Sequence, residues 1–302
     1  MNDSALIERI AARGDGVTAD GRHVAGAVPG DRVLADGTLV PGPNRAEPVC
    51  RHFGKCGGCQ LQHVAEGALA DFVRDRVAGA LAAQQVEASD IFPAQLPPRE
   101  SRRRAALTAL RAGKHVALGF NAAQSNQIVD MRQCPLLRPD LFALIAPIRD
   151  LLAAIAPQRR PVKVKLQALD QGAEVVLEGV RAEGLDAAMA LQDFAGAHAL
   201  ARLAIDQGDG LEILWQPEPP TVCFGDIAVE VPPFAFLQAT TAGEAALLGA
   251  VREAIGDAPA VADLFAGVGT FALSVQAGRK GYAADGARDA IRALTGAANR
   301  AR

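Results

Sequence analysis

The sequence predicts a protein of the α/β class that also carries a separate, small β domain. Turn signals recur at short intervals through residues 4–40, which suits a small antiparallel β unit. Alternating strands and helices fill the middle of the chain, as in a mixed α+β domain. Residues 241–302 read as a helix followed by strand, glycine turn, helix, strand and helix, the opening of a doubly wound sheet.

Length and composition allow two or three compact domains, because 50% of the 302 residues are hydrophobic. The net charge of −3 does not by itself indicate a polyanionic partner, although a local basic patch can still bind nucleic acid. The amino terminus lacks a basic segment followed by an apolar run, and no stretch approaches the roughly 18 apolar residues of a membrane span. We expect a monomeric cytoplasmic protein without a membrane partner.

Residues 1–45 are expected to form the small, barrel-like β domain. Its end is marked by Pro41-Gly42-Pro43-Asn44, where two prolines and a glycine disfavour regular structure. A proline-free segment over 63–84 follows, with apolar residues at the i, i+3, i+4 spacing of an amphipathic helix.

Residues 46–225 are expected to form the central α+β domain. The segments 105–110 and 116–120 flank Ala112-Gly113-Lys114 and predict a hairpin. A helix is predicted over 139–155. Two further hairpins are predicted over 163–177 and 201–215, the second turning at 206–210.

Residues 226–302 are expected to begin a nucleotide-binding domain. The predicted elements are helices over 241–255, 270–276 and 287–301 and strands over 261–265 and 281–285. Ahead of them, the pattern of 232–240 predicts a rigid apolar strand in which Gln238 is the polar exception.

Three of the five cysteines, Cys50, Cys56 and Cys59, fall close together, and Cys134 followed by Pro135 is a fourth candidate ligand. Iron–sulfur clusters take thiolates from a tight loop and from a remote cysteine. A structural zinc site could use the same four residues, but it usually has two CxxC pairs where this chain has one. The pattern therefore favours an iron–sulfur cluster over zinc or a set of buried thiols.

A second motif, Asp263-Leu264-Phe265-Ala266-Gly267-Val268-Gly269-Thr270, follows an apolar strand and precedes a predicted helix. Asp285 closes the next strand, where a ribose-binding carboxylate belongs. The acidic Asp263 inside the strand favours S-adenosylmethionine over NAD. A tight turn that binds nothing is the simpler alternative.

Arginines gather around a predicted strand at Arg99, Arg102, Arg103, Arg104 and Arg111. Charge alone does not separate contact with RNA phosphate from a solvated surface run.

Taken in this order, the motifs resemble those of the uracil-5 RNA methyltransferases of the class I fold, particularly the ribosomal RNA enzymes that combine a TRAM domain with a [4Fe–4S] cluster. The resemblance is carried by Cys-Gly-Gly-Cys-Gln-Leu-Gln-His at 56–63, Gln-Cys-Pro at 133–135, Phe-Leu-Gln at 236–238 and Asp-Leu-Phe-Ala-Gly-Val-Gly-Thr-Phe at 263–271. It implies a TRAM-like domain over 1–45, a central domain that carries the cluster over 46–225, and the start of a Rossmann-like methyltransferase domain over 226–302.

The resemblance also implies roles for individual residues. S-adenosyl-L-methionine would be bound by Gln238, Asp263, Phe265, Gly267, Gly269, Thr270 and Asp285. The cluster would be held by Cys50, Cys56, Cys59 and Cys134. From their charge alone, Arg102, Arg103 and Arg104 are the candidates for contact with RNA. Ribosomal RNA is favoured over transfer RNA as the partner. Two residues depart from the common family pattern, Thr240 in place of asparagine and Asp285 in place of glutamate.

The resemblance implies a covalent mechanism in which a cysteine thiolate attacks C6 of uracil and a carboxylate later removes the C5 proton. Both groups are expected beyond residue 302, and no catalytic residue is assigned within the chain. We expect Cys223 to be a core thiol in a β segment. The competing hypotheses are an RNA-binding iron–sulfur protein without catalysis, a transfer RNA uracil-5 methyltransferase and an NAD-linked oxidoreductase.

Overall fold

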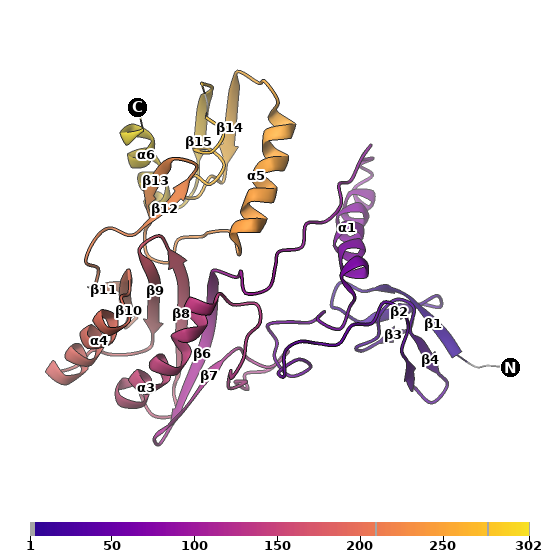
Figure 1. Ribbon diagram of the computed structural model, residues 1–302, viewed down its shortest axis with the longest axis horizontal. Coiled ribbons are helices and arrows are strands. Elements are labelled where there is room, and N and C mark those ends of the chain that lie inside the picture. Colours follow the sequence, from indigo (N-terminus) through magenta and orange to yellow (C-terminus); the bar gives the residue numbers. More distant parts are fainter. Residues whose placement is uncertain (1–3, 209, 277, 302) are drawn as a thin grey trace. The chain divides into compact units, whose positions relative to one another are not determined.

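The computed structural model describes residues 4–208, 210–276 and 278–301 (Figure 1). The chain forms two compact units, Met1–Leu96 and Pro97–Arg302, and each is described by itself. Asp209 of the predicted turn lies outside the described residues. Within those residues, no helix combines the length and the apolar character needed to cross a membrane.

The first unit is built on a five-stranded antiparallel sheet, as predicted for this region. Its strands follow the order β3-β2-β1-β4-β5 and are β1 (Ser4–Ile10), β2 (Gly16–Thr18), β3 (His23–Val24), β4 (Arg32–Leu34) and β5 (Leu39–Val40). Ile7, Ala27 and Val33 form a small core. A second small core joins Ile10 and Val28 to Phe72 of helix α1 (Glu66–Ala83).

Helix α1 confirms the helix predicted from the apolar spacing of 63–84. Its first two turns contribute Ala68, Leu69 and Phe72 to the second core. Further along, Val73 and Val77 are exposed, so only the first part of the apolar stripe is used for packing within the unit.

The buried carboxylate of Asp31 organises the loops of the first unit. It accepts hydrogen bonds from the amides of Val28 at 2.9 Å and Gly42 at 2.8 Å, and it pairs with the guanidinium of Arg45. Burial alone would raise the pKa of Asp31, but the bonds from Arg45, Val28 and Gly42 outweigh it and hold that pKa below 3.8. One carboxylate therefore fixes two separate points of the backbone and the side chain of Arg45.

Asp31→Asn is expected to destabilise the first unit by about 1.5–3 kcal/mol, because the amide loses the charge that these donors share. Since the folded pKa of Asp31 is depressed, its contribution is complete above the unfolded pKa near 4 and is lost as the pH falls through the folded value. Hydrogen–deuterium exchange at Val28 and Gly42 should accelerate in the variant at neutral pH. Equal exchange in both proteins would contradict the assignment.

The second unit contains a six-stranded mixed sheet with the order β11-β10-β9-β8-β6-β7. Its strands are β6 (Arg104–Ala112), β7 (His115–Gly119), β8 (Pro161–Leu169), β9 (Gly172–Glu178), β10 (Arg202–Asp206) and β11 (Leu211–Trp215). The three predicted hairpins are confirmed as β6–β7, β8–β9 and β10–β11. Strands β9 and β10 run parallel and are connected through helix α4 (Leu185–Ala197), an element that the sequence analysis does not predict.

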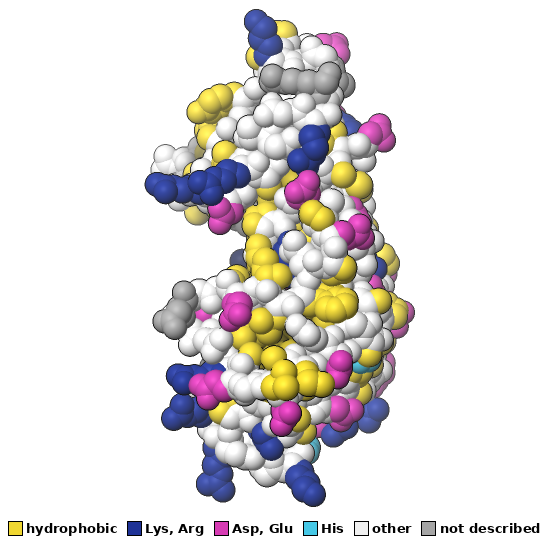
Figure 2. Space-filling view, turned by 90° about the vertical axis from the view of Figure 1, so that its left-hand side faces the viewer, with side chains coloured by type: hydrophobic (Ala, Val, Ile, Leu, Met, Phe, Trp, Pro, Cys, Tyr) yellow, Lys and Arg dark blue, Asp and Glu magenta, His cyan; other side chains and the backbone are white. Residues whose placement is uncertain are grey.

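The helix predicted over 139–155 is two helices, α2 (Pro139–Ala143) and α3 (Ile145–Ile155). Pro147 has no amide hydrogen to donate to the carbonyl of Ala143, so a continuous helix would lack a bond at this point. Helix α3 buries Ile145, Ile148, Leu151 and Leu152 in the main core with the apolar face of the sheet. The side of the sheet that ends in α4 and β11 faces the viewer in Figure 2, where apolar side chains gather on the surface. Among the exposed apolar residues of these two elements are Leu185, Met189, Leu211 and Ile213.

A hairpin of β12 (Thr221–Phe224) and β13 (Ile227–Glu230) follows the mixed sheet. Cys223 lies on β12, as predicted, but it is exposed, so the prediction of a core thiol is wrong. Its neighbours Val222 and Phe224 point to the core and Cys223 to the opposite face, because successive residues of a strand alternate. The segment 232–240 is a loop that turns at Pro233-Phe234, contrary to the predicted strand, and its last residue, Thr240, forms an isolated antiparallel bridge with Arg102.

The last part of the second unit contains α5 (Thr241–Ile255), β14 (Ala260–Leu264), β15 (Lys280–Ala284) and α6 (Arg288–Arg300). Strands β14 and β15 are parallel, as predicted. The helix predicted over 270–276 is a series of turns: Leu273 and Val275 donate to the carbonyls of Gly269 and Phe271, but no regular helix forms. Val222, Phe224, Val229, Val268 and Leu294 share one core, which ties the β12–β13 hairpin to the β14 turn and α6.

Candidate functional site

The chain turns tightly directly after β14. Phe265 has a φ of +68°, a conformation unusual for a residue with a side chain, and its ring is 90% exposed. The amides of Phe265 and Ala266 both donate to the carbonyl of Ala284, at 2.8 and 3.0 Å, which fixes the turn at the end of β15. Such strain is maintained only when the surrounding contacts impose it, and it is concentrated at functional sites.

Gly269 is required in this turn for two reasons. Its φ is +102°, which favours glycine, and a Cβ there would lie 2.9 Å from the side chain of Leu273 and 3.0 Å from that of Leu294. The backbone therefore approaches the core closely at this point. Gly267, also at positive φ, has no atom within 4 Å of an added Cβ, so it leaves open space beside the turn.

Asp285 joins the two strand ends. One carboxylate oxygen accepts from the amide of Gly267 at 2.8 Å, and the other accepts from the amide of Ala287 at 2.8 Å. The bonds from Ala287 and Gly267 hold the pKa of Asp285 below 3.8. The side chain is half-buried, and a carboxylate has about four lone-pair sites, so Asp285 can accept further hydrogen bonds from a ligand hydroxyl.

Asp263 plays a different part in the same turn. Its carboxylate accepts from the amide of Ala272 at 3.0 Å, so it ties β14 to the segment that replaces the predicted helix. Burial and the nearby charge of Asp285 raise the pKa of Asp263. Thr270 is half-buried between these points, and its carbonyl accepts from the hydroxyl of Ser274.

Gln238 lies on the loop 232–240 and is held through its backbone. Its carbonyl accepts from the guanidinium of Arg103 at 2.9 Å, and the carbonyl of Leu237 accepts from Arg104 at 2.9 Å. The residue lines a cavity of about 270 Å³ that includes Arg102, Leu136 and Thr240, whereas Asp263 lines another cavity in the same unit. Thr240 caps α5, because its hydroxyl accepts a hydrogen bond from the amide of Gly243 at 3.0 Å. The threonine that departs from the common family pattern at this position therefore has a structural role.

The arginines have three different settings. Arg103 is 4% exposed and forms an ion pair with Glu244. Arg104 lies over the rings of Phe234 and Phe236, 5.4 and 4.9 Å from their centroids. Arg102 is exposed. Arg103 does not fit the predicted RNA contact, because it is buried. Its guanidinium instead supports the loop that carries Gln238.

The cysteines predicted to bind a metal are divided between the units. Cys50, Cys56 and Cys59 lie in the first unit on a loop of turns, and Cys134 lies in the second unit; all four are half-buried thiols. In the part of the chain that the structure describes, no three His, Cys, Asp or Glu side chains are grouped as metal ligands. The iron–sulfur cluster therefore stays a prediction.

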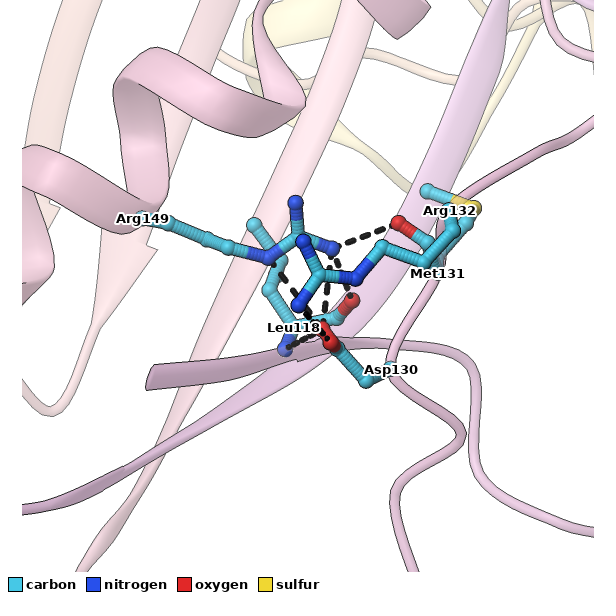
Figure 3. Close-up of polar contacts among 5 residues, drawn as sticks. All are labelled: Leu118, Asp130, Met131, Arg132 and Arg149. Carbon is cyan, nitrogen blue, oxygen red and sulfur yellow. Dashed lines mark hydrogen bonds and ion pairs between the residues drawn. The ribbon is translucent and has the colours of Figure 1, made fainter. Parts of the chain in front are cut away.

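The segment that leads to Cys134 is fixed by a polar cluster (Figure 3). Arg149 of α3 donates to the carboxylate of Asp130 at 2.9 Å and to the carbonyls of Leu118 and Met131. Asp130 also pairs with Arg132 at 2.7 Å. Burial opposes ionisation, but the amide of Leu118 and the two arginines prevail and lower the pKa of Asp130.

Comparison with known proteins decides the family. No family model matches the chain. It is 45% identical to an uncharacterised RNA methyltransferase of Zymomonas mobilis over 97% of this chain and 74% of the relative. The chain belongs to the RNA methyltransferases. A second RNA methyltransferase, from Rhizobium meliloti, is 35% identical over 98% of this chain and 74% of its own length.

Two more distant proteins that resemble this chain have names that state their substrates. The 23S rRNA (uracil(1939)-C(5))-methyltransferase RlmD of Halomonas elongata is 29% identical over 98% of this RNA methyltransferase and 68% of the relative. The solved structure of the Pyrococcus abyssi tRNA (uracil-54, C5)-methyltransferase, in complex with S-adenosyl-L-homocysteine, matches with a TM-score of 0.73 over 99% of this chain and 77% of that one. At 18% identity, this match shows a shared fold of mixed α/β content.

Proposed function

We propose that this RNA methyltransferase transfers a methyl group from S-adenosyl-L-methionine to C5 of a uridine in RNA, with 23S ribosomal RNA as the favoured substrate. The observation that carries the donor site is Asp285, which two backbone amides hold at the end of β15 beside the glycine turn of β14. In doubly wound sheets, ligands bind outside the carboxyl ends of the strands. The preference for ribosomal RNA follows from the similarity to the 23S ribosomal RNA methyltransferase of Halomonas elongata.

The donor would be bound by the residues of the strand-end turn together with the loop 232–240. Asp285 would accept hydrogen bonds from the ribose hydroxyls, and the open space beside Gly267 would allow close approach to the backbone. Phe265, Thr270 and Gln238 would complete the site, with Asp263 and Gly269 maintaining the shape of the turn. When bound, S-adenosyl-L-methionine supplies an electrophilic methyl group.

The RNA would contact the second unit beside the same loop. Arg102 is exposed, and Arg104 is half-buried with its guanidinium over two aromatic rings, so both can present positive charge to a phosphate. Arg103 is left out of this contact because it is buried.

No described residue is assigned as the nucleophile that attacks C6. Cys223 is exposed, but partial burial, its hydrogen bond with Asp170 and the charges of Asp170 and Asp226 raise its pKa. A thiol of raised pKa carries little of the thiolate that this reaction needs. Cys223 is therefore not proposed as catalytic.

We also propose that Cys50, Cys56, Cys59 and Cys134 bind a [4Fe–4S] cluster, and that residues 1–45, 46–225 and 226–302 act as TRAM-like, cluster-carrying and Rossmann-like domains. The cysteine spacing and the order of the motifs support this proposal. The support comes from the sequence alone, because no three ligand side chains of the described residues are grouped as a metal site. Anaerobic purification followed by iron and sulfide analysis tests the cluster. One zinc per chain without visible absorbance would overturn it.

Asp285→Ala is expected to weaken binding of S-adenosyl-L-homocysteine about 10- to 100-fold, because hydrogen bonds to a charged group contribute about 1.5–3 kcal/mol. Isothermal titration calorimetry measures this directly. Asp289→Ala, at an exposed pair with Arg292 on α6, is the matched control and should bind as the unmodified protein does. Unchanged binding in Asp285→Ala, or NAD binding that S-adenosyl-L-homocysteine does not displace, would contradict the proposed donor site.

The RNA substrate is tested separately. Methylated uridines are mapped in RNA from cells with and without the gene. Loss of one 5-methyluridine in 23S ribosomal RNA is the expected result. If 5-methyluridine is lost only from transfer RNA, then transfer RNA and not 23S ribosomal RNA is the substrate. If no 5-methyluridine is lost, the result favours an RNA-binding protein without catalysis.

A further inference from the structure

The mixed sheet of the second unit has two edges, and the chain covers the one at β7. There the segment 128–131 lies alongside the strand. The amide of Val129 donates to the carbonyl of Phe120 and that of Met131 to the carbonyl of Leu118, both at 2.9 Å. At the other edge lies β11. In the part of the chain that the structure describes, β11 forms backbone hydrogen bonds only with β10, so its outer side is an open edge.

An open edge strand can pair with another extended segment, because every second residue directs its N–H and C=O away from the sheet. Native edge strands are commonly protected by lysine, by proline or by a bulge. The sequence of β11 is Leu-Glu-Ile-Leu-Trp, with neither lysine nor proline. The register shift of the β10–β11 pair comes after Ile213, so residues 211–213 keep regular pairing and are suited to accept a further strand.

Two apolar side chains of β11 lie beside this edge without being buried. Leu211 is 46% exposed and Ile213 is 45% exposed. They pair with Asp206 and Ala204, so they share the face of the sheet that is turned away from Ile205 and the main core. Apolar side chains gather on this side of the unit in Figure 2. A strand added to β11 would cover both residues with its own apolar side chains.

The charges around this edge have one sign. From Ala182 to Pro220 the sequence contains a single Lys or Arg, which is Arg202, and its guanidinium is buried against Glu174. Exposed carboxylates of the same stretch include Asp186, Asp193, Glu212 and Glu218. The edge therefore combines an open backbone, an apolar strip and negative charge.

This combination discriminates among the possible occupants. RNA is disfavoured, because its phosphates would meet carboxylates. A second copy of the chain is disfavoured as well, since two paired β11 strands would bring Glu212 close to its counterpart, and like charges across a strand pair are destabilising. An extended peptide that has lysine or arginine among its apolar residues fits both the strand edge and its charge.

We propose that β11 binds an extended, positively charged peptide segment of a partner protein, which adds to the mixed sheet as a further strand. Backbone hydrogen bonds would pair the two strands. Apolar residues of the peptide would cover Leu211 and Ile213, and its cations would lie near Glu212. The site uses none of the residues proposed to bind the methyl donor or RNA, so it gives the methyltransferase a protein partner in addition to its RNA.

The probe for this site is a fluorescently labelled peptide of alternating lysine and valine, whose binding to the full chain is followed by fluorescence anisotropy. Methylation of its amide nitrogens is expected to weaken binding at least about 10-fold, because strand pairing is blocked while the charge stays. A peptide of alternating glutamate and valine should not bind. Equal binding of the methylated and unmethylated lysine peptides would overturn the proposal.

Variants of β11 test the same site from the side of the protein. Glu212→Lys is expected to weaken peptide binding about 3- to 10-fold, because attraction across the strand pair becomes repulsion. Ile213→Lys is expected to weaken it about 10-fold or more, as an apolar contact is lost and a like charge is added. Glu253→Lys, at an exposed position of α5, is the matched control and should bind the peptide as the unmodified protein does. Equal binding by Glu212→Lys and Glu253→Lys would contradict the peptide site, and this comparison does not depend on the folding of Ile213→Lys.

The other occupants and the donor site are tested on the same proteins. A dimer of the unmodified protein in light scattering that Ile213→Lys dissociates would show that a second copy occupies the edge. Tighter binding of single-stranded RNA by Glu212→Lys than by Glu253→Lys would show RNA there, because both variants add the same charge. Either result would overturn the proposal. S-adenosyl-L-homocysteine binding should be unchanged in all variants, so failure of the peptide site is distinguishable from failure of the proposed donor site.

Discussion

Replacing Arg202 by leucine is expected to lower the free energy of unfolding of the second unit by about 3–5 kcal/mol, the usual loss when one partner of a buried ion pair is removed. Arg202 is 3% exposed, and its guanidinium lies 2.6 Å from the fully buried carboxylate of Glu174. Burial already raises the pKa of Glu174, and without Arg202 the main opposing charge is gone. The carboxylate must then take up a proton or stay buried as an uncompensated charge.

The same pair supports the start of the loop that carries Gln238. Arg202 donates to the carbonyl of Val231 at 2.8 Å, and Glu174 accepts from the amide of Phe234 at 3.1 Å. Phe234 itself has a φ of +48°, so its conformation depends on such contacts. Loss of Arg202 should therefore loosen this loop as well as destabilise the core.

Urea denaturation followed by the fluorescence of Trp215 measures the effect, because Trp215 is the single tryptophan of the chain and lies on β11 of the second unit. The matched control is Arg181→Leu, which breaks an exposed pair with Glu183 and should cost less than about 1 kcal/mol. The double variant Glu174→Leu with Arg202→Leu should recover part of the loss, since no lone charge remains while the bonds to Val231 and Phe234 stay absent. A loss in Arg202→Leu no larger than in Arg181→Leu would contradict the interpretation.

Local patterns predicted the secondary structure well where the signal lies within a few residues. The three hairpins around Gly113, Gly172 and 206–210 follow from alternating residues and glycine turns, and α5 begins and ends where its periodicity does. The errors have local causes that periodicity does not register. Pro147 divides one predicted helix, and the turn at Gly269 leaves too few consecutive bonds for another.

The candidate site was predictable to the extent that its residues are neighbours in the sequence. The motif from Asp263 to Thr270 and the strand end at Asp285 do come together, through the bond from Gly267 to Asp285. The setting of Gln238 was not predictable, because the residues that hold it are Arg103 and Arg104, more than one hundred positions earlier in the chain. Charge clustering left contact with RNA open for Arg103, because its partner Glu244 is distant in sequence and the pairing is not visible in the local pattern.

Replacing Arg103 by leucine is therefore expected to affect stability and donor binding together. The guanidinium of Arg103 donates to the carbonyl of Gln238 and pairs with Glu244 of α5, and the two side chains are 5% and 15% exposed. Removing it should cost about 3–5 kcal/mol in the Trp215 unfolding measurement, because Glu244 is left as a largely buried charge. S-adenosyl-L-homocysteine should also bind more weakly, since Gln238 loses the contact that positions it.

Two variants separate this positioning role from a general effect of charge. Arg292→Leu removes an exposed arginine on α6 that pairs with Asp289, and it should change neither stability nor donor binding. Arg103→Lys keeps the charge but lacks the planar fork that reaches Gln238 and Glu244 at once, so it should retain more stability than Arg103→Leu and still bind the donor product weakly. Full donor binding in a folded Arg103→Lys protein would show that Gln238 does not depend on Arg103, and Arg103 would then be a structural residue alone.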